Sequence, residues 1–340
     1  RGVAVAAQGG SSDIVVLSSR PEYITGGDAV IRVDVRSGVS LSAVNVFLND
    51  TNVTSSFRQD ASAHALVGLV SGFVDGENTL SANAKGSQPG FAARARVRNS
   101  PSHGPIFSGP HQQPWICQTE ASGLGPAPAS GPCVAPTQYD WFYRTTAGQF
   151  APYDPSTPPA DVAQTTTIDG KTVNYIVRVE SGTINESIYR IAVLFDPARP
   201  WSPWDAQPGW NHKLFYPFGA NCNTYHTQGA AQNVQIDRAL SRGFMVATSS
   251  LNVLGGNCNS VVSAESVMML KEHIVEHYGE IRYTFAQGLS GGSIQQHEIA
   301  NAYPGLLQGI QPNCSYEDMW SGAFVEIYDC HLLMRYYTAS

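Results

Sequence analysis

Residues 288–292 read Gly-Leu-Ser-Gly-Gly, and they lie between an apolar run at 281–286 and a helix-like segment at 291–302. The apolar run predicts a strand, and the spacing of apolar residues after the serine predicts a helix. A tight turn between them forces Ser290 into a strained backbone conformation that small neighbours tolerate. The serine then projects above the sheet, where the positive end of the helix helps to stabilise an oxyanion. Gly-x-Ser-x-Gly also occurs in plain glycine-rich loops, but this setting favours Ser290 as a catalytic nucleophile.

Strands and helices alternate on both sides of this turn. An Asp-Gly pair at 169–170 suits a type I′ turn, so residues 165–179 are expected to form a hairpin. Apolar runs predict strands at 188–195, 212–218, 244–249 and 307–311, and helical spacing predicts helices that end near 243 and span 260–278. The alternation implies a mostly parallel sheet wrapped by helices, which is the α/β class.

From about residue 160 to its end, the chain resembles the α/β-hydrolase superfamily. Its Gly-rich turn also resembles the tannase and feruloyl-esterase branch, which has a similar Ser-x-Gly-Gly run. That branch usually has a cysteine directly before the nucleophile, where this chain has Leu289, so its disulfide between the nucleophile and histidine regions does not carry over. The whole chain also looks like a group of bacterial secreted proteins known only as a domain of unknown function.

The resemblance gives a role to residues 218–222, Phe-Gly-Ala-Asn-Cys, which follow a predicted strand where α/β-hydrolases carry an oxyanion loop. It implies that a backbone N–H near Gly219 or Ala220 acts together with the N–H of Gly291. Two such donors would stabilise the tetrahedral intermediate of acyl transfer. An ordinary tight turn is the alternative interpretation of this segment.

The acid and the base of a catalytic triad are harder to assign. His331 is the one histidine well beyond Ser290, but it lies too close to Asp329 for the two to form the usual pair. Asp318 is a candidate acid and His331 a candidate base. His297 lies two turns along the helix and reads as a packed or exposed helix residue. We expect the usual acid and base on a second polypeptide, a C-terminal fragment of the same protein.

The chain divides into three parts by composition. Residues 12–99 carry short alternating runs about ten residues apart, which predict an all-β immunoglobulin-like sandwich with strands at 14–17, 29–36, 44–48, 66–70, 78–84 and 92–97. Residues 100–160 are a Pro/Gly-rich connector, in which His111 and Trp115 would line a site or pack as linker. Residues 161–340 are expected to be the N-terminal part of an α/β-hydrolase domain that is incomplete in this chain.

The six cysteines lack Cys-x-x-Cys pairs, which favours disulfides over metal binding. Sequential pairing is the simplest connectivity, and the alternative is six reduced, buried thiols; the predicted pairs are Cys117–Cys133, Cys222–Cys258 and Cys314–Cys330. An Ala-x-Ala pattern near the start resembles the tail of a signal peptide. A secreted or periplasmic protein is therefore expected.

The composition excludes several classes of function. The net charge is -7, which argues against a nucleic-acid surface, and no apolar run has the length of a membrane span. No metal-ligand spacing, P-loop or dinucleotide fingerprint appears, so neither a cofactor nor a metal is expected.

The leading hypothesis is a serine hydrolase that cleaves carboxylic esters. An amidase or peptidase with the same machinery and a non-catalytic binding protein on a hydrolase scaffold are the alternatives. A cluster of tryptophans, Trp201, Trp204 and Trp210, would form either a substrate wall or packed loops.

Overall fold

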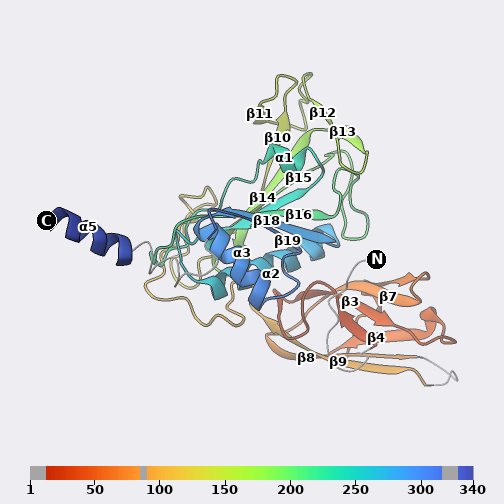
Figure 1. Cartoon of the computed structure of the whole chain (residues 1–340). Coiled ribbons are helices and arrows are strands. Elements are labelled where there is room, and N and C mark those ends of the chain that lie inside the picture. The colour runs from red at the N-terminus through yellow and green to blue at the C-terminus, as the bar shows by residue number, and fades with distance from the viewer. Residues whose placement is uncertain (1–12, 85–89, 316–327, 340) are drawn as a thin grey trace.

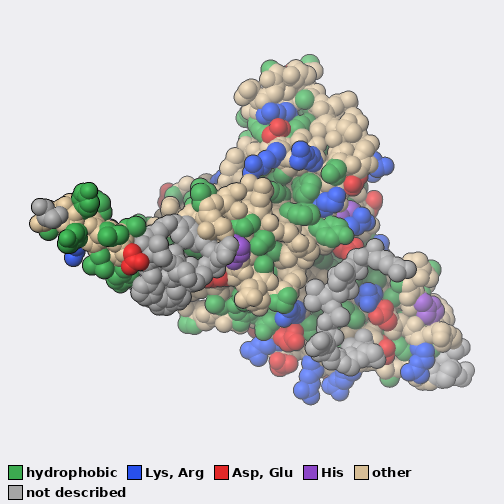
Figure 2. Space-filling model, in the orientation of Figure 1, with side chains coloured by type: hydrophobic (Ala, Val, Ile, Leu, Met, Phe, Trp, Pro, Cys, Tyr) green, Lys and Arg blue, Asp and Glu red, His purple; other side chains and the backbone are tan. Residues whose placement is uncertain are grey.

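The computed structural model describes residues 13–84, 90–315 and 328–339. The first range and the start of the second form a β-sandwich, and most of the rest forms a mixed α/β domain (Figure 1). Helix α5 (Cys330–Ala339) lies apart from both (Figure 1). Every residue of α5 is exposed, and Figure 2 shows apolar side chains gathered on it.

The sandwich consists of two sheets, with strand orders β1-β3-β7-β6 and β2-β9-β8-β4-β5. Alternating side chains of the strands point inward, so that Ile31, Val46 and Leu80 lie in one aliphatic core between the sheets. All six predicted strands are confirmed, and short strands accompany them. The strands are β1 (Ile14–Val16), β2 (Ile24–Thr25), β3 (Asp28–Asp34), β4 (Val44–Leu48), β5 (Thr51–Asn52), β6 (Phe57–Asp60), β7 (Ala65–Ser71), β8 (Gly76–Ala84) and β9 (Ala92–Ser100).

The α/β domain is built on an eight-stranded sheet of order β11-β10-β14-β15-β17-β16-β18-β19. From β11 to β17 the neighbours are antiparallel, and from β17 to β19 they are parallel. The strands are β10 (Gln138–Arg144), β11 (Phe150–Pro152), β14 (Ile176–Ile184), β15 (Ser187–Leu194), β16 (Lys213–Phe218), β17 (Met245–Ser249), β18 (Tyr283–Leu289) and β19 (Gly309–Asn313). The expected mostly parallel sheet is therefore wrong for this half. A two-residue turn at Asn185 and Glu186, both with positive φ, joins β14 to β15, and such a turn permits only antiparallel pairing.

Two strands lie inside the segment expected to be a connector. Strand β10 pairs with β14 along most of its length, so the sheet starts before residue 161. Its sequence is rich in aromatic residues, which fit a pleated surface well, although prolines flank it on both sides. The hairpin predicted at 165–179 is confirmed in part, since β12 (Gln164–Thr166) pairs with β13 (Thr172–Asn174), but residues from Ile176 onward belong to β14 of the main sheet. Gly170 has a positive φ and Asp169 does not, so the turn is not of type I′.

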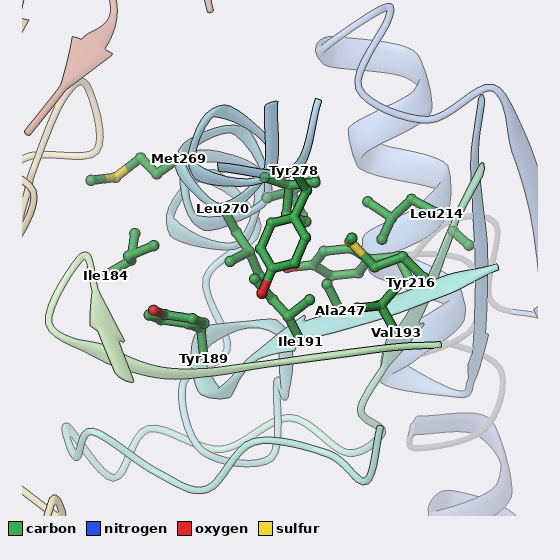
Figure 3. Close-up of a cluster of buried hydrophobic side chains, with 14 of the residues drawn as sticks. Ile184, Tyr189, Ile191, Val193, Leu214, Tyr216, Ala247, Met269, Leu270 and Tyr278 are labelled. Atoms are coloured by element: carbon green, nitrogen blue, oxygen red, sulfur yellow. The ribbon is translucent and has the colours of Figure 1, made fainter. Parts of the chain in front are cut away.

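Helices cover both faces of the sheet. On one face, α2 (Ser260–Tyr278) and α3 (Gly291–Ala302) bury the main core, in which Leu214, Tyr216 and Leu270 are fully buried (Figure 3). On the other face, the short helix α1 (Asp237–Leu240) packs on β14, β15 and β17. The bounds predicted for the helices at 260–278 and 291–302 are confirmed.

The second face is left partly bare at β18. Tyr283, Phe285 and Leu289 of this strand are 44%, 38% and 50% exposed, whereas Thr284 and Ala286 on the α3 face are buried. Arg238 of α1 lies over the ring of Phe215 in β16 and donates to the Gln287 side chain of β18, but the three large apolar side chains of β18 remain partly exposed. We call Tyr283, Phe285 and Leu289 the β18 strip.

Two of the three predicted disulfides are formed. Cys117 is bonded to Cys133 in the segment before β10, and Cys222 to Cys258 between the loops that follow β16 and β17. The third predicted pair is not formed, because Cys314 and Cys330 are free and exposed. Cys314 directly follows β19, whereas Cys330 starts the separate helix α5.

Helix α2 also holds the sandwich against the α/β domain. Thr25 donates hydrogen bonds from its backbone N–H and its hydroxyl to the carboxyl group of Glu272, at 3.1 and 2.6 Å. Burial raises the pKa of Glu272 to about 8 and that of Glu276, one turn further along, to about 10. Burial thus favours the neutral form of both carboxyl groups, which costs less to bury than a charged carboxylate.

Candidate active site

The turn at Ser290 has the strained geometry that the sequence predicts. Ser290 has φ 55° and ψ −114° and joins the end of β18 directly to α3. A side chain at Gly288 would lie 2.8 Å from the Cα of Gly292, so the two glycines allow the strand and the helix to meet. The Ser290 N–H donates to the carbonyl oxygen of Asn313, which ties the turn to the end of β19. The chain thus holds one strained serine at the carboxyl edge of the parallel strands.

The predicted oxyanion loop packs directly on this turn. A Cβ at Gly291 would lie 1.9 Å from the carbonyl oxygen of Asn221, and one at Gly292 would lie 2.8 Å from that of Phe218. Asn221 itself has a positive φ of 65°. The segment that follows β16 is therefore brought against the residues that follow Ser290, as the resemblance implies. Larger side chains at either glycine would separate the two.

Two backbone donors at this junction have no acceptor. Within the described part of the chain, neither the Ala220 N–H nor the Gly291 N–H donates a hydrogen bond. The Gly291 N–H is one of the donors that the first turn of every helix leaves unused. The Gly219 N–H, by contrast, donates to the carbonyl of Asn252, so it is engaged elsewhere. Of the two loop residues named from the sequence, Ala220 is thus the better candidate donor.

A buried amide connects the loop to the helix. Gln295 is fully buried in α3, and its Nε2 donates to the carbonyl oxygens of Gly219 at 3.0 Å and Gly291 at 3.3 Å. Its Oε1 accepts a hydrogen bond from Ser263 at 2.6 Å. Asn252 in turn donates to the Ser263 side chain. Sequence reasoning missed this network, although a glutamine on the buried face of a helix is an unusual feature that would have singled it out.

The candidate acid and base are not brought to Ser290 by the described residues. Asp318 lies outside the described ranges, and His331 is exposed on the separate helix α5. His297 contacts the hydroxyl of Ser315 at 2.9 Å instead of Ser290. In the part of the chain that the structure describes, no histidine is hydrogen-bonded to the Ser290 side chain.

A buried carboxylate–histidine pair does exist, but it lies elsewhere. The Glu180 carboxylate contacts His273 Nε2 at 2.6 Å and accepts hydrogen bonds from Tyr189 and Tyr278. Burial opposes the charge, yet these partners hold the pKa of Glu180 at about 2. This pair fastens α2 to β14, and among the described residues neither Glu180 nor His273 is hydrogen-bonded to Ser290.

The connector and the loop after β16 enclose a cavity of about 200 Å³, which His111, Trp115, Thr224 and His226 help to line. His111 and Trp115 pack ring against ring, with centroids 4.5 Å apart, which agrees with a packed linker.

The three tryptophans make packing contacts, which favours the interpretation as packed loops. Trp201 stacks on Phe195 and donates to the carbonyl of Tyr278, Trp210 is buried, and the guanidinium group of Arg58 lies over the ring of Trp204.

The Cys222–Cys258 disulfide is expected to hold the oxyanion loop in place. Replacing both cysteines by serine should lower the free energy of unfolding by about 3–4 kcal/mol, because the bond closes a loop across 36 residues. It should also lower kcat. Asn221, which directly precedes Cys222, packs against Gly291 beside Ser290, and this contact would loosen without the disulfide. The Cys117→Ser, Cys133→Ser variant is the matched control, with a comparable loss of stability and an unchanged kcat in chemical denaturation and turnover assays. Equal effects on kcat would contradict the assignment of the loop.

No helix within the described ranges is long and apolar enough to cross a membrane. In the same ranges, no cluster of three or more histidine, cysteine, aspartate or glutamate side chains is arranged to hold a metal ion.

The fold and the site together define a mixed α/β protein with a strained serine between a strand and a helix. The chain belongs to the tannase-like family of unknown function (DUF6351), which matches residues 14–340. No curated protein is significantly similar to it.

Three solved structures are similar to part of this chain. Tannin acyl hydrolase from Aspergillus niger is 9% identical, with 58% of this chain and 36% of that chain covered and a TM-score of 0.28. Esterase E22 is 13% identical, with 56% and 51% covered and a TM-score of 0.24. Oligopeptidase B from Leishmania major is 9% identical, with 88% and 35% covered and a TM-score of 0.27. The chain thus spans 35% to 51% of the length of these proteins.

Proposed function

We propose that the protein is a secreted serine hydrolase that cleaves carboxylic esters through Ser290. The observation that carries the proposal is the strained backbone of Ser290 between β18 and α3, where the N–H groups of Ala220 and Gly291 have no acceptor among the described residues. A serine held in a sparsely populated conformation has a functional explanation more often than a structural one. Membership of a tannase-like family supports hydrolysis as the class of reaction.

The chemistry follows from these groups. The Ser290 hydroxyl oxygen attacks the ester carbonyl carbon while a base takes its proton, and the carbonyl oxygen becomes an oxyanion. We propose that the N–H groups of Ala220 and Gly291 donate to that oxyanion. Collapse of the intermediate breaks the bond to the alcohol, which leaves with the proton. Water then hydrolyses the acyl-enzyme and regenerates Ser290.

Amides and peptides would react at the same groups as esters. Comparing the turnover of an activated ester with that of an anilide distinguishes an esterase from an amidase or peptidase.

The base and the acid are proposed to come from a C-terminal fragment of the same protein that covers the β18 strip. Three large apolar side chains exposed along one strand favour a partner surface at this place, because a sheet in an α/β protein is normally covered on both faces. The strip ends at Leu289, one residue before Ser290, so a segment that covers it also reaches the nucleophile.

The proposal extends to the sandwich and to the cell compartment. Two mostly antiparallel sheets around one core support an immunoglobulin-like module. We propose that it acts as a spacer or docking surface, since its described residues hold no reactive cluster. The two disulfides support a secreted or periplasmic location.

Covalent labelling tests the proposal. A fluorophosphonate probe added to the full-length protein is expected to modify Ser290, and peptide mass spectrometry should locate the adduct. The Ser290→Ala variant should take up no label, while Ser293→Ala, one helical turn away, should label as the wild type does. A wild-type protein that remains unlabelled would mean a non-catalytic protein on a hydrolase scaffold.

A further inference from the structure

We propose that Gln295 is a positioning residue that orients the oxyanion hole by holding two backbone carbonyl groups at once. The inference rests on the proposed function of Ser290. It concerns a side chain that does not touch the reacting atoms and acts through the peptide groups of Gly219 and Gly291. Gln295 lies five residues after Ser290 on α3, on the face that packs against the oxyanion loop.

The geometry of a peptide unit carries the first step. In a trans peptide the C=O and the N–H point in opposite directions, and the peptide bond between Gly219 and Ala220 is trans. Gln295 Nε2 binds the Gly219 carbonyl oxygen at 3.0 Å. The Ala220 N–H of the same peptide therefore points away from Gln295, and it is one of the two donors without an acceptor. Holding the carbonyl thus fixes the direction of the donor.

The second N–H of the Gln295 amide binds the turn at Ser290. Nε2 donates to the carbonyl oxygen of Gly291, the residue after Ser290, at 3.3 Å. The loop and the helix are thereby fixed relative to one another by a single planar group. The two donors of the hole come from different segments, and their separation matters because an oxyanion accepts from both at about 2.7–3.1 Å.

The network behind Gln295 fixes which way its amide faces. Ser263 donates to Oε1 at 2.6 Å, which leaves Nε2 to face the two carbonyls. Asn252 donates both to the Ser263 hydroxyl at 2.9 Å and to the Ser263 carbonyl at 2.8 Å. Because the Ser263 hydroxyl oxygen accepts from Asn252, its hydrogen is directed to Gln295 Oε1. All of these side chains are fully buried, and water does not compete for the bonds. The amide is therefore oriented before any substrate binds.

Two substitutions at Gln295 test the proposal. Gln295→Leu removes both donors, and Gln295→Glu keeps the shape but donates only when protonated. Loss of one oxyanion donor lowers kcat by about 10²–10³-fold in a well-studied protease, so we expect about a 100-fold fall in kcat with little change in KM. The affinity for a trifluoromethyl ketone, which forms a tetrahedral adduct, should fall in proportion to kcat/KM. The activity of Gln295→Glu relative to wild type should rise toward acid pH, as the new carboxyl group takes up a proton.

Gln207 provides a matched control. It is also buried, donates from Nε2 to two carbonyl oxygens, those of Asp196 and Arg199, and accepts from one backbone N–H. It lies after β15, which runs antiparallel to β17, and hence at the edge of the sheet opposite Ser290. Gln207→Leu should cost similar stability in thermal unfolding and leave kcat unchanged.

The outcomes separate the inference from the proposed function. If the wild type labels and turns over substrate while Gln295→Leu loses no more kcat than Gln207→Leu, the inference is wrong and the function stands. If the wild type neither labels nor turns over substrate, the proposed function itself fails. If Gln295→Leu does not fold, Ser263→Ala provides a second test. This variant keeps the Gln295 amide but removes the hydrogen bond that fixes its orientation. This variant should show a smaller fall in kcat and the same unchanged KM.

Discussion

Replacing Gly291 by alanine is expected to lower kcat for ester hydrolysis by about 10²–10³-fold, the cost of losing an oxyanion-hole donor. The added methyl group would lie 1.9 Å from the carbonyl oxygen of Asn221. Backbone atoms at that distance must move apart, and the oxyanion loop then leaves the turn. Ser290 keeps its own strand and helix, so phosphonate labelling should be slowed and not abolished. Steady-state kinetics together with labelling rates measure both effects.

Gly256 offers the control for this substitution. A Cβ there would lie 3.5 Å from the carbonyl oxygen of Val253, which is ordinary van der Waals contact. Gly256→Ala should therefore leave kcat and labelling unchanged. If Gly291→Ala behaved in the same way, the packing of the loop on the turn would have no role in catalysis.

Replacing Glu276 by glutamine is expected to make the protein more stable at alkaline pH and to change little at pH 5. Glu276 is 5% exposed, and its Oε1 has no hydrogen-bond partner among the described residues. Burial raises its pKa to about 10, with the nearby Glu272 and Asp28 carboxyl groups adding to the effect. The folded protein thus keeps a proton that the unfolded chain releases near its ordinary pKa of about 4.3.

The sign of the pH dependence follows from that difference. The stabilising effect of the neutral carboxyl group is complete below about pH 4.3 and is lost steadily as the pH rises toward about 10, because only the unfolded chain ionises in this interval. The amide of the Glu276→Gln variant does not ionise, so this variant should exceed the wild type by at least about 1 kcal/mol at pH 9, equivalent to one pKa unit. Urea denaturation at pH 5 and pH 9 measures this difference. The exposed Glu120→Gln control should show no such gain, and a wild type equally stable at both pH values would contradict the prediction.

Regular helices and the strained turn were predictable because local sequence determines them. The bounds of α2 follow from apolar residues at helical spacing, and Asn259 caps its first turn as expected for an asparagine before a helix. The turn at Ser290 follows from glycines that no other residue could replace. Both features depend on neighbours within a few residues in the chain.

Features that depend on distant neighbours were not predictable in the same way. Strand β10 lies among prolines, and its pairing with β14 is made across about 40 residues of sequence, which no local pattern reveals. The third disulfide was expected from order along the chain alone, whereas Cys330 lies on a helix apart from Cys314. The role of Gln295 depends on a loop more than 70 residues earlier, with which it shares no sequence pattern.

The division of the sheet into an antiparallel and a parallel half has a consequence for how the protein folds. Strands β14 and β15 are joined by a two-residue turn, so their pairing requires little loop closure. The parallel pairs β16–β17 and β16–β18 require crossovers through whole helices, and contacts of such long range form slowly. The turn at Ser290 belongs to this slower half. We therefore expect folding intermediates in which the antiparallel half is already ordered while Ser290 is still without the loop that follows β16.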